Sequence, residues 1–143
     1  MVAHIRALGE IEKENILNTY IFKIIMMNEK LIQEAIQILN PKTIDNVDMG
    51  GVACALITDQ NTIFKGVCID TISGMGLCAE HAAISQMITQ GEYSVRKIVA
   101  VKKDSKGSVF ILPPCGRCRE FMYQTNKSNL ETDVVLGKIR WQS

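Results

Sequence analysis

Three cysteines are spaced so that they can bind one metal ion. Cys115 and Cys118 form a Cys-x-x-Cys pair at the start of a predicted helix, and Cys78 opens another predicted helix earlier in the chain. Thiols at helix N-termini meet free backbone N–H groups and the positive end of the helix dipole, so we expect their pKa values to fall. Three thiolates from two helix ends predict a Zn²⁺ site whose fourth position stays open for water, as in catalytic zinc sites.

Glu80 follows Cys78 by two residues and lies in the first turn of the same predicted helix. Its carboxylate is expected to reach a water at the metal without binding the metal itself. Hydrolytic deamination needs such a group, because a proton must leave the water, protonate the ring nitrogen and later depart with the ammonia. The residues therefore predict a zinc-dependent aminohydrolase in which Glu80 is catalytic.

Two other readings of the cysteines stay open. A closed structural zinc site would need a fourth ligand, and His81 is the nearest candidate, although we expect it to be packed or at the surface. The chain would then be a non-catalytic, zinc-stabilised module whose apolar helices form an oligomer interface. A redox pair is disfavoured, because it would need neither Cys78 nor Glu80. Cys54 lies in an apolar strand and is expected in the core.

The segments CAE, ending at Glu80, and PCGRC, ending at Cys118, resemble the two halves of the zinc-dependent cytidine deaminase signature. Within that superfamily, the segment LPPCGRCRE is most similar to the blasticidin-S deaminase branch and to related small bacterial deaminases. The resemblance covers about residues 28 to 138. It implies Cys78, Cys115 and Cys118 as zinc ligands, Glu80 as the proton shuttle, backbone groups around Ala79 and Pro114 beside the substrate ring, and a homotetramer.

The sugar-binding part departs from the family pattern. Nucleoside-acting members resemble one another in a G-x-N-x-E segment whose Asn and Glu hold the ribose. Here Cys68 stands in place of the Asn and Asp70 in place of the Glu. We expect both residues at the substrate pocket, with a place in the core as the alternative for Cys68. The substrate is accordingly expected to be a cytosine-like or other aminated heterocycle (base, modified base or nucleoside), with cytidine itself a poor one.

Two further residues are candidates around the site. Three thiolates on one Zn²⁺ leave a net negative charge, which a guanidinium hydrogen-bonded to a sulfur would offset. Arg117, between the two cysteines of the pair, is expected to supply it. Trp141 lies near the end of the chain. It is expected either to pack at a surface or interface, or to close an active site, in its own chain or in a neighbouring subunit.

The elements that must position these residues alternate between strands and helices. Residues 1–26 are expected to form a helical extension, although Met26 and Met27 leave open a translation start there, and residues 27–143 form the deaminase domain. The pattern predicts strands at 51–57, 62–69, 95–101, 109–112 and 132–138, and helices at 10–25, 28–39, 78–90 and 115–124. This order predicts an α/β fold, a three-layer α/β/α sandwich with one mixed sheet of about five strands.

Composition excludes several other classes of protein. The chain has 143 residues, of which 47% are hydrophobic and 22% charged, as in one globular domain. A net charge of +1 and 6% aromatic residues disfavour a nucleic acid polymer as a partner, because such domains are usually basic and offer stacking platforms. No apolar run reaches the ~18 residues of a membrane helix. Five cysteines without a visible secretory signal favour the cytoplasm.

Overall fold

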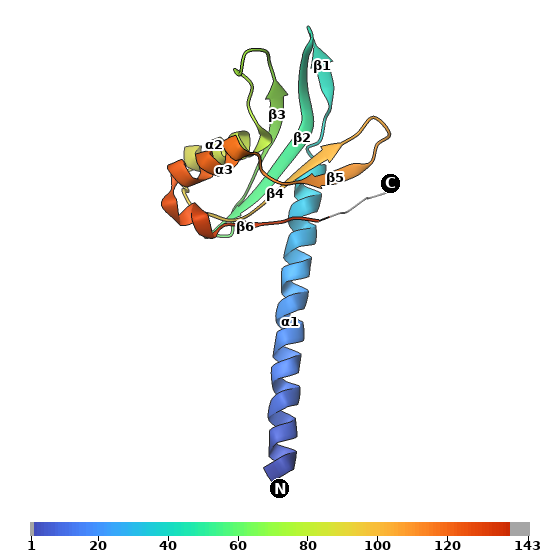
Figure 1. Ribbon diagram of the computed structural model, residues 1–143, viewed down its shortest axis with the longest axis vertical. Helices are drawn as coiled ribbons and strands as arrows, with labels where there is room; N and C mark the ends of the chain where they lie inside the picture. Colours follow the sequence, from blue (N-terminus) through green and yellow to red (C-terminus); the bar gives the residue numbers. More distant parts are fainter. Residues whose placement is uncertain (1, 138–143) are drawn as a thin grey trace. The chain divides into compact units, whose positions relative to one another are not determined.

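The computed structural model describes residues 2–137, with side chains from residue 9 onward. The chain divides into two compact units, Met1–Lys30 and Leu31–Ser143. A single helix, α1 (Val2–Ile36), replaces the two helices predicted at 10–25 and 28–39 (Figure 1). The helix runs through the predicted break because neither proline nor glycine interrupts residues 26–28.

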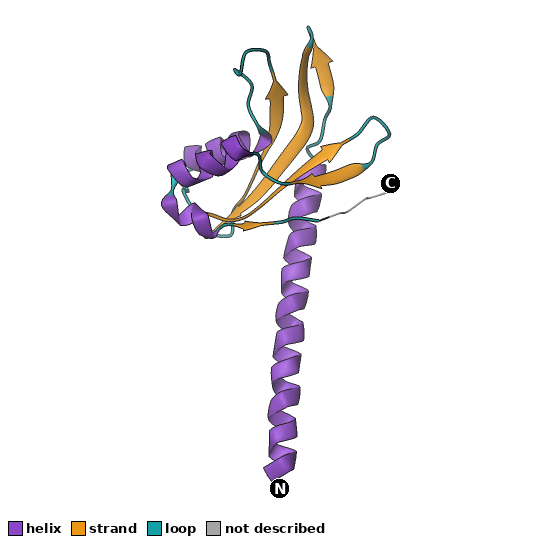
Figure 2. Ribbon diagram, in the orientation of Figure 1, coloured by secondary structure: helices purple, strands orange, loops and turns teal. Residues whose placement is uncertain are grey.

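The second unit is built on one mixed sheet of six strands (Figure 2). The central strand β2 pairs antiparallel with β1, β3 and β4, while β4 also pairs antiparallel with β5 and parallel with β6. The strands are β1 (Lys42–Ile44), β2 (Val47–Thr58), β3 (Ile63–Asp70), β4 (Val95–Lys103), β5 (Val109–Leu112) and β6 (Asp133–Val134).

The prediction of about five strands missed one strand and lengthened another. Strand β1 was missed because all three of its residues are exposed, so it carries no hydrophobic alternation. The strand predicted at 132–138 has only the two residues of β6, and a 3₁₀ helix (Lys127–Glu131) precedes it. The Asn126 side chain caps that helix by accepting a hydrogen bond from Ser128 N–H.

Helices α2 (Ala79–Thr89) and α3 (Gly116–Thr125) lie side by side over one face of the sheet (Figure 1). On this face, Cys54 and Leu56 of β2 join the buried residues Ala83, Ile84 and Met87 of α2 in one apolar core. Helix α2 ends where Gly91 adopts a positive φ of 82°, a conformation that glycine enters without steric cost.

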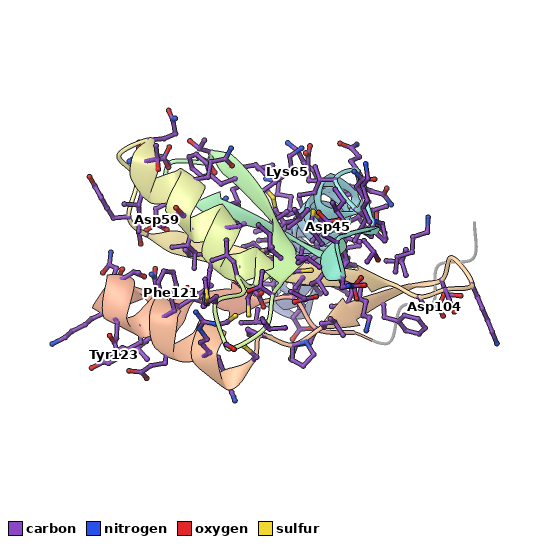
Figure 3. All side chains as sticks on the ribbon, turned by 90° about the horizontal axis from the view of Figure 1, so that it is seen from above. Asp45, Asp59, Lys65, Asp104, Phe121 and Tyr123 are labelled. Atoms are coloured by element: carbon purple, nitrogen blue, oxygen red, sulfur yellow. The ribbon has the colours of Figure 1, made fainter. Side chains whose placement is uncertain are left out.

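The opposite face of β2 is buried as well. Ala53 and Ala55 are fully buried there, and Lys65 of β3 shares this face because it pairs with Ala55. The Lys65 Nζ atom contacts the Glu34 carboxylate at 2.8 Å, which places the last turns of α1 on this side (Figure 3). Helices therefore cover both faces of the sheet, and the predicted α/β class is confirmed.

Helix α2 lies unusually close to strand β3 at Gly66. A Cβ atom at this position would lie 2.4 Å from the backbone nitrogen of Ala83 and 2.5 Å from the Ala82 Cβ. Only glycine permits this approach without a shift of the helix. This contact sets how closely α2 lies to β3, and with it the position of the helix start, where Cys78 and Glu80 lie.

Candidate active site

Two helix N-termini bring the three predicted cysteines together. Cys78 is the N-cap residue of α2, and Cys115 is the N-cap residue of α3, where its sulfur accepts a hydrogen bond from Cys118 N–H at 3.3 Å. Both caps have extended backbone dihedral angles, with ψ of 152° and 168°. Pro113 and Pro114 hold the chain extended before α3, since neither can donate a backbone hydrogen bond.

The geometry of the thiols fits a metal ion. The Sγ atoms of Cys115 and Cys118 are 3.3 Å apart, those of Cys78 and Cys115 are 3.9 Å apart, and all three lie within 4.8 Å of one another. Zn–S bonds of about 2.3 Å at tetrahedral angles would separate two sulfurs by about 3.8 Å. The cluster therefore has the donor type and the spacing of a zinc site with three protein ligands.

The expectation that all three thiols have lowered pKa values is correct only for Cys115. Burial alone would raise the pKa of Cys115, but hydrogen bonds from Cys118 N–H and from the neighbouring thiols outweigh it, so the pKa is lowered. Burial raises the pKa of both Cys78 and Cys118. Burial therefore opposes the effect of the helix N-termini at Cys78 and Cys118. Binding of a metal by all three residues would require each thiol to lose its proton.

Glu80 lies beside the cysteine cluster. Its side chain is buried at 6% exposure in the first turn of α2. After burial and the hydrogen bonds among the thiols, its negative charge also raises the pKa of each of the three cysteines. Glu80, Cys78 and Cys115 line one cavity.

A cavity of about 180 Å³ opens at this cluster. The cysteines Cys78 and Cys115 form part of its wall together with Ala79 and Glu80. Cys68 and Asp70 of β3 also line it, and the remaining wall comes from Val52, Ala100, Leu112 and Pro113. Cys78, Cys115 and Glu80 border the same space, and the Cys118 sulfur, which does not line it, lies within 4.8 Å of the sulfurs of Cys78 and Cys115.

Comparison with known proteins identifies the family. The model of the cytidine and deoxycytidylate deaminase zinc-binding region matches residues 26–132. The chain belongs to this family. It is accordingly a zinc-dependent deaminase, and the Cys78–Cys115–Cys118 cluster is where its described residues can hold the metal.

Named relatives agree with this family. A cytidine deaminase of Halalkalibacterium halodurans is 32% identical over 116 residues, covering 80% of this chain and 83% of the relative. A probable cytidine deaminase of Dictyostelium discoideum is 37% identical over 71 residues, covering 49% of this chain and 46% of the relative. The crystal structure of cytidine deaminase from Mycobacterium leprae matches at 25% identity with a TM-score of 0.60, covering 76% of this chain and 86% of that one.

The cavity beside the cysteine cluster is lined by most, but not all, of the residues singled out from the sequence. Ala79, Cys68 and Asp70 line it as expected. Pro113, adjacent to the expected Pro114, also lines it, whereas Pro114 lines a separate hollow with Met122 and Tyr123. Trp141 lies outside the described residues.

Arg117 has a different partner from the one expected. Its guanidinium donates to the carbonyl of Gly76 at 3.2 Å rather than to a cysteine sulfur in the described structure. Arg117 is exposed on α3, and the loop between β3 and α2 offers the nearer acceptor. This hydrogen bond therefore links the loop between β3 and α2 to α3.

His81 is packed between the two helices. It is 4% exposed, and its ring centroid lies 4.3 Å from that of Phe121 on α3. Burial, and then the charge of Arg117, lower the pKa of His81. The packed position expected for His81 is confirmed.

Four wall residues of the deaminase pocket escaped the sequence analysis as pocket residues. They are apolar side chains and one proline from strands and a loop, namely Val52, Ala100, Leu112 and Pro113. Their residue types are those of any buried strand, so the sequence carries no signal that separates them from the core. Their place beside the cysteines follows only from the pairing of β2, β4 and β5.

Proposed function

We propose that this chain hydrolyses the exocyclic amine of a cytosine-like ring held in the 180 Å³ cavity, and releases ammonia. The observation that carries the proposal is a cluster of three thiols, two of which, Cys78 and Cys115, line one cavity together with the buried Glu80. In this proposal, Cys78, Cys115 and Cys118 hold the zinc and Glu80 moves the protons.

In the proposed reaction, the zinc ligands, Glu80 and the cavity wall have separate roles. When bound, the zinc supplies a Lewis acid and an activated water. The Glu80 carboxylate would accept a proton from that water and give it to the ring nitrogen, then accept the remaining proton of the added hydroxyl and give it to the departing amine. Ala79 and Pro113 border the ring and exclude bulk water. Atoms balance, since one water enters and one ammonia leaves while the ring gains a carbonyl oxygen.

The side of the pocket that would meet a sugar favours a substrate other than cytidine. The Cys68 sulfur accepts a hydrogen bond from Val52 N–H at 3.3 Å and lies 3.7 Å from an Asp70 carboxylate oxygen. Both contacts join protein groups to one another. A thiol is also a weaker hydrogen-bond donor than the carboxamide of the Asn that it replaces. Ribose hydroxyls would be left underpaired, which costs ~1–3 kcal/mol for each buried group. The similarity of LPPCGRCRE to the blasticidin-S branch also supports a substrate other than cytidine.

A panel of cytosine, cytidine, deoxycytidine, 5-substituted cytosines and blasticidin S tests this proposal by ammonia release. We expect a base or a differently substituted heterocycle to be preferred over cytidine. Cys68→Asn should raise kcat/KM for cytidine by about tenfold, since one good hydrogen bond is worth ~1 kcal/mol or slightly more. Cys68→Ser is the control, because its hydroxyl still accepts from Val52 but supplies no carboxamide.

An ordinary cytidine deaminase is the second candidate. Asp70 favours it, since its carboxylate lines the cavity where the family places a sugar-binding glutamate. The names of the relatives favour it too. In that case kcat/KM for cytidine would reach the ~10⁵ M⁻¹s⁻¹ of an ordinary enzyme, and Asp70→Asn would lower it.

The assembly and location belong to the same proposal. A closed homotetramer is supported by the family resemblance and by the apolar residues left exposed on the described surface. Sedimentation of the zinc-loaded chain should give four chains per particle, and a monomer at micromolar concentration would contradict it. A cytoplasmic location is supported by the five cysteines, all of them free thiols. Among the described residues, no helix is long and apolar enough to span a membrane.

A further inference from the structure

A pair of rings joins helices α2 and α3 near the ends that carry the cysteines. The His81 imidazole is 4% exposed, and its centroid lies 4.3 Å from that of the Phe121 ring, with the two planes tilted by 44°. Phe121 also packs against the apolar core between α2 and the sheet. His81 therefore contacts a side chain whose own position is held by that core.

The two rings have the same spacing from a cysteine of the cluster on each helix. His81 follows Cys78 by three residues, and Phe121 follows Cys118 by three residues. Residues three apart are neighbours on a helix surface, and their side chains lean toward the helix N-terminus. The ring contact thus lies about one turn from the place where the three sulfurs come within 4.8 Å of one another.

Beside the ring pair, a hollow of about 440 Å³ separates the two helices. Its wall includes Ser85 of α2 and, on α3, Glu120 and Gln124, together with the two rings themselves. Among the described residues, no ion pair joins residues 79–89 to residues 116–125. The distance between α2 and α3 near the cysteines is therefore set largely by the ring contact.

His81 offers α3 two contacts, ring packing on Phe121 and a hydrogen bond with the Arg117 backbone. Its buried Nε2 atom has no hydrogen-bond partner in the described part of the structure. A buried polar atom without a partner destabilises a fold. The packing of the ring, rather than its polarity, is accordingly the property that an apolar ring could replace.

We propose that His81 is a positioning residue of the zinc site. By packing on Phe121 it sets the separation of α2 and α3, and with it the distance from the Cys78 sulfur to the sulfurs of the Cys-x-x-Cys pair. This inference rests on the three-cysteine ligand set proposed above. Residues that orient metal ligands without touching the metal typically change metal affinity by ~10–100-fold when they are replaced.

The zinc dissociation constant of the full-length chain, measured by competition with a chelator, tests this role. His81→Ala should raise the constant by ~10–100-fold, while one zinc per chain still binds at saturating zinc. Phe121→Ala should raise it too, and the double variant should raise it by far less than the product of the two single effects, because the rings act through each other. Tyr123→Ala is the matched control, since Tyr123 lies about 200° around α3 from Phe121 and should leave the constant unchanged.

Two further substitutions separate packing from hydrogen bonding. His81→Phe keeps a ring against Phe121, and the adjoining hollow leaves room for the larger ring, so the dissociation constant should stay near the wild-type value. His81→Gln keeps a hydrogen-bonding side chain without a ring and should behave like His81→Ala. Wild-type affinity in His81→Ala, or weaker binding by the Phe variant than by the Gln variant, would overturn the proposal.

Urea unfolding of the zinc-free variants distinguishes positioning from general stability. A purely structural contact would lower the free energy of unfolding and leave the zinc dissociation constant of the folded chain unchanged, which would also overturn the proposal. Where a variant does not fold without zinc, the rate of zinc release from the loaded chain decides, and a wild-type rate in His81→Ala counts against the role. Failure of the ligand set is recognised separately, because Cys115→Ala would then keep its zinc whatever the His81 variants do.

Discussion

At the scale of single residues, the role proposed for Glu80 is to move protons, since its buried side chain lines the cavity beside Cys78 and Cys115. Glu80→Gln keeps the size of the side chain but cannot exchange a proton. We expect turnover to fall by ~10²–10⁴-fold with zinc content unchanged. Ammonia release on the preferred substrate of the panel measures the loss, and exposed Glu131→Gln is the control for the same chemical change. Near-normal turnover would remove Glu80 from the mechanism.

The loss of zinc on removing a cysteine should depend on whether that cysteine belongs to the cluster. Cys115→Ala deletes one of three clustered sulfurs, so the variant should retain well under half an equivalent of zinc after dialysis. Cys54→Ala deletes a fully buried thiol outside the cluster and should keep its zinc. Metal analysis of the two purified variants provides the comparison. Full zinc retention by Cys115→Ala would refute the proposed ligand set.

At the scale of elements, the contact between α2 and β3 sets the position of the catalytic turn. Gly66→Ala places a Cβ 2.4 Å from the Ala83 nitrogen, and backbone at that distance must move. We expect a loss of ~1–3 kcal/mol in the free energy of unfolding, as for other overpacked sites. Turnover should fall as well, because the displaced helix carries Cys78 and Glu80.

Gly51→Ala is the matched control for this prediction. A Cβ at Gly51 in β2 meets no heavy atom within 4 Å, so both stability and turnover should stay near the wild-type values. Thermal unfolding and ammonia release are measured for both variants. Equal stability of the two variants would show that α2 does not press on β3 in solution.

At the scale of the whole molecule, zinc should stabilise the fold without being required for it. The metal joins the starts of α2 and α3, but the apolar core between α2 and the sheet contains none of the three proposed ligands. At free zinc ~1,000-fold above its dissociation constant, binding adds ~4 kcal/mol to stability. Chelation should therefore lower Tm by on the order of 10 °C and leave a folded protein.

Circular dichroism with and without a chelator measures this effect. Cys115→Ala is the control, since a chain that binds little zinc should show little change in Tm. Complete loss of structure on chelation at 25 °C would instead favour the zinc-stabilised structural module, in which metal binding and folding are one event.

Chemistry that depends on residue type and short spacing was readable from the chain alone. The Cys-x-x-Cys pair, the third cysteine and Glu80 are predicted as one site from the sequence. The structure clusters the three sulfurs within 4.8 Å and places Cys78, Cys115 and Glu80 at one cavity. The central strands and the helices α2 and α3 were predicted within a few residues, because their apolar periodicity is local. Strand β1 and the short β6 were not, since long-range pairing forms them rather than their own pattern.

The tertiary structure decided what the sequence pattern left open. Burial in the folded chain raises the pKa of Cys78 and Cys118 against the effect of the helix ends, a balance that no local motif contains. Pro113, which precedes α3, lines the cavity, and the Gly76 carbonyl accepts a hydrogen bond from the Arg117 guanidinium. Motifs specify which groups do the chemistry because that depends on residue type, whereas their neighbours and protonation depend on atoms brought together from distant parts of the chain.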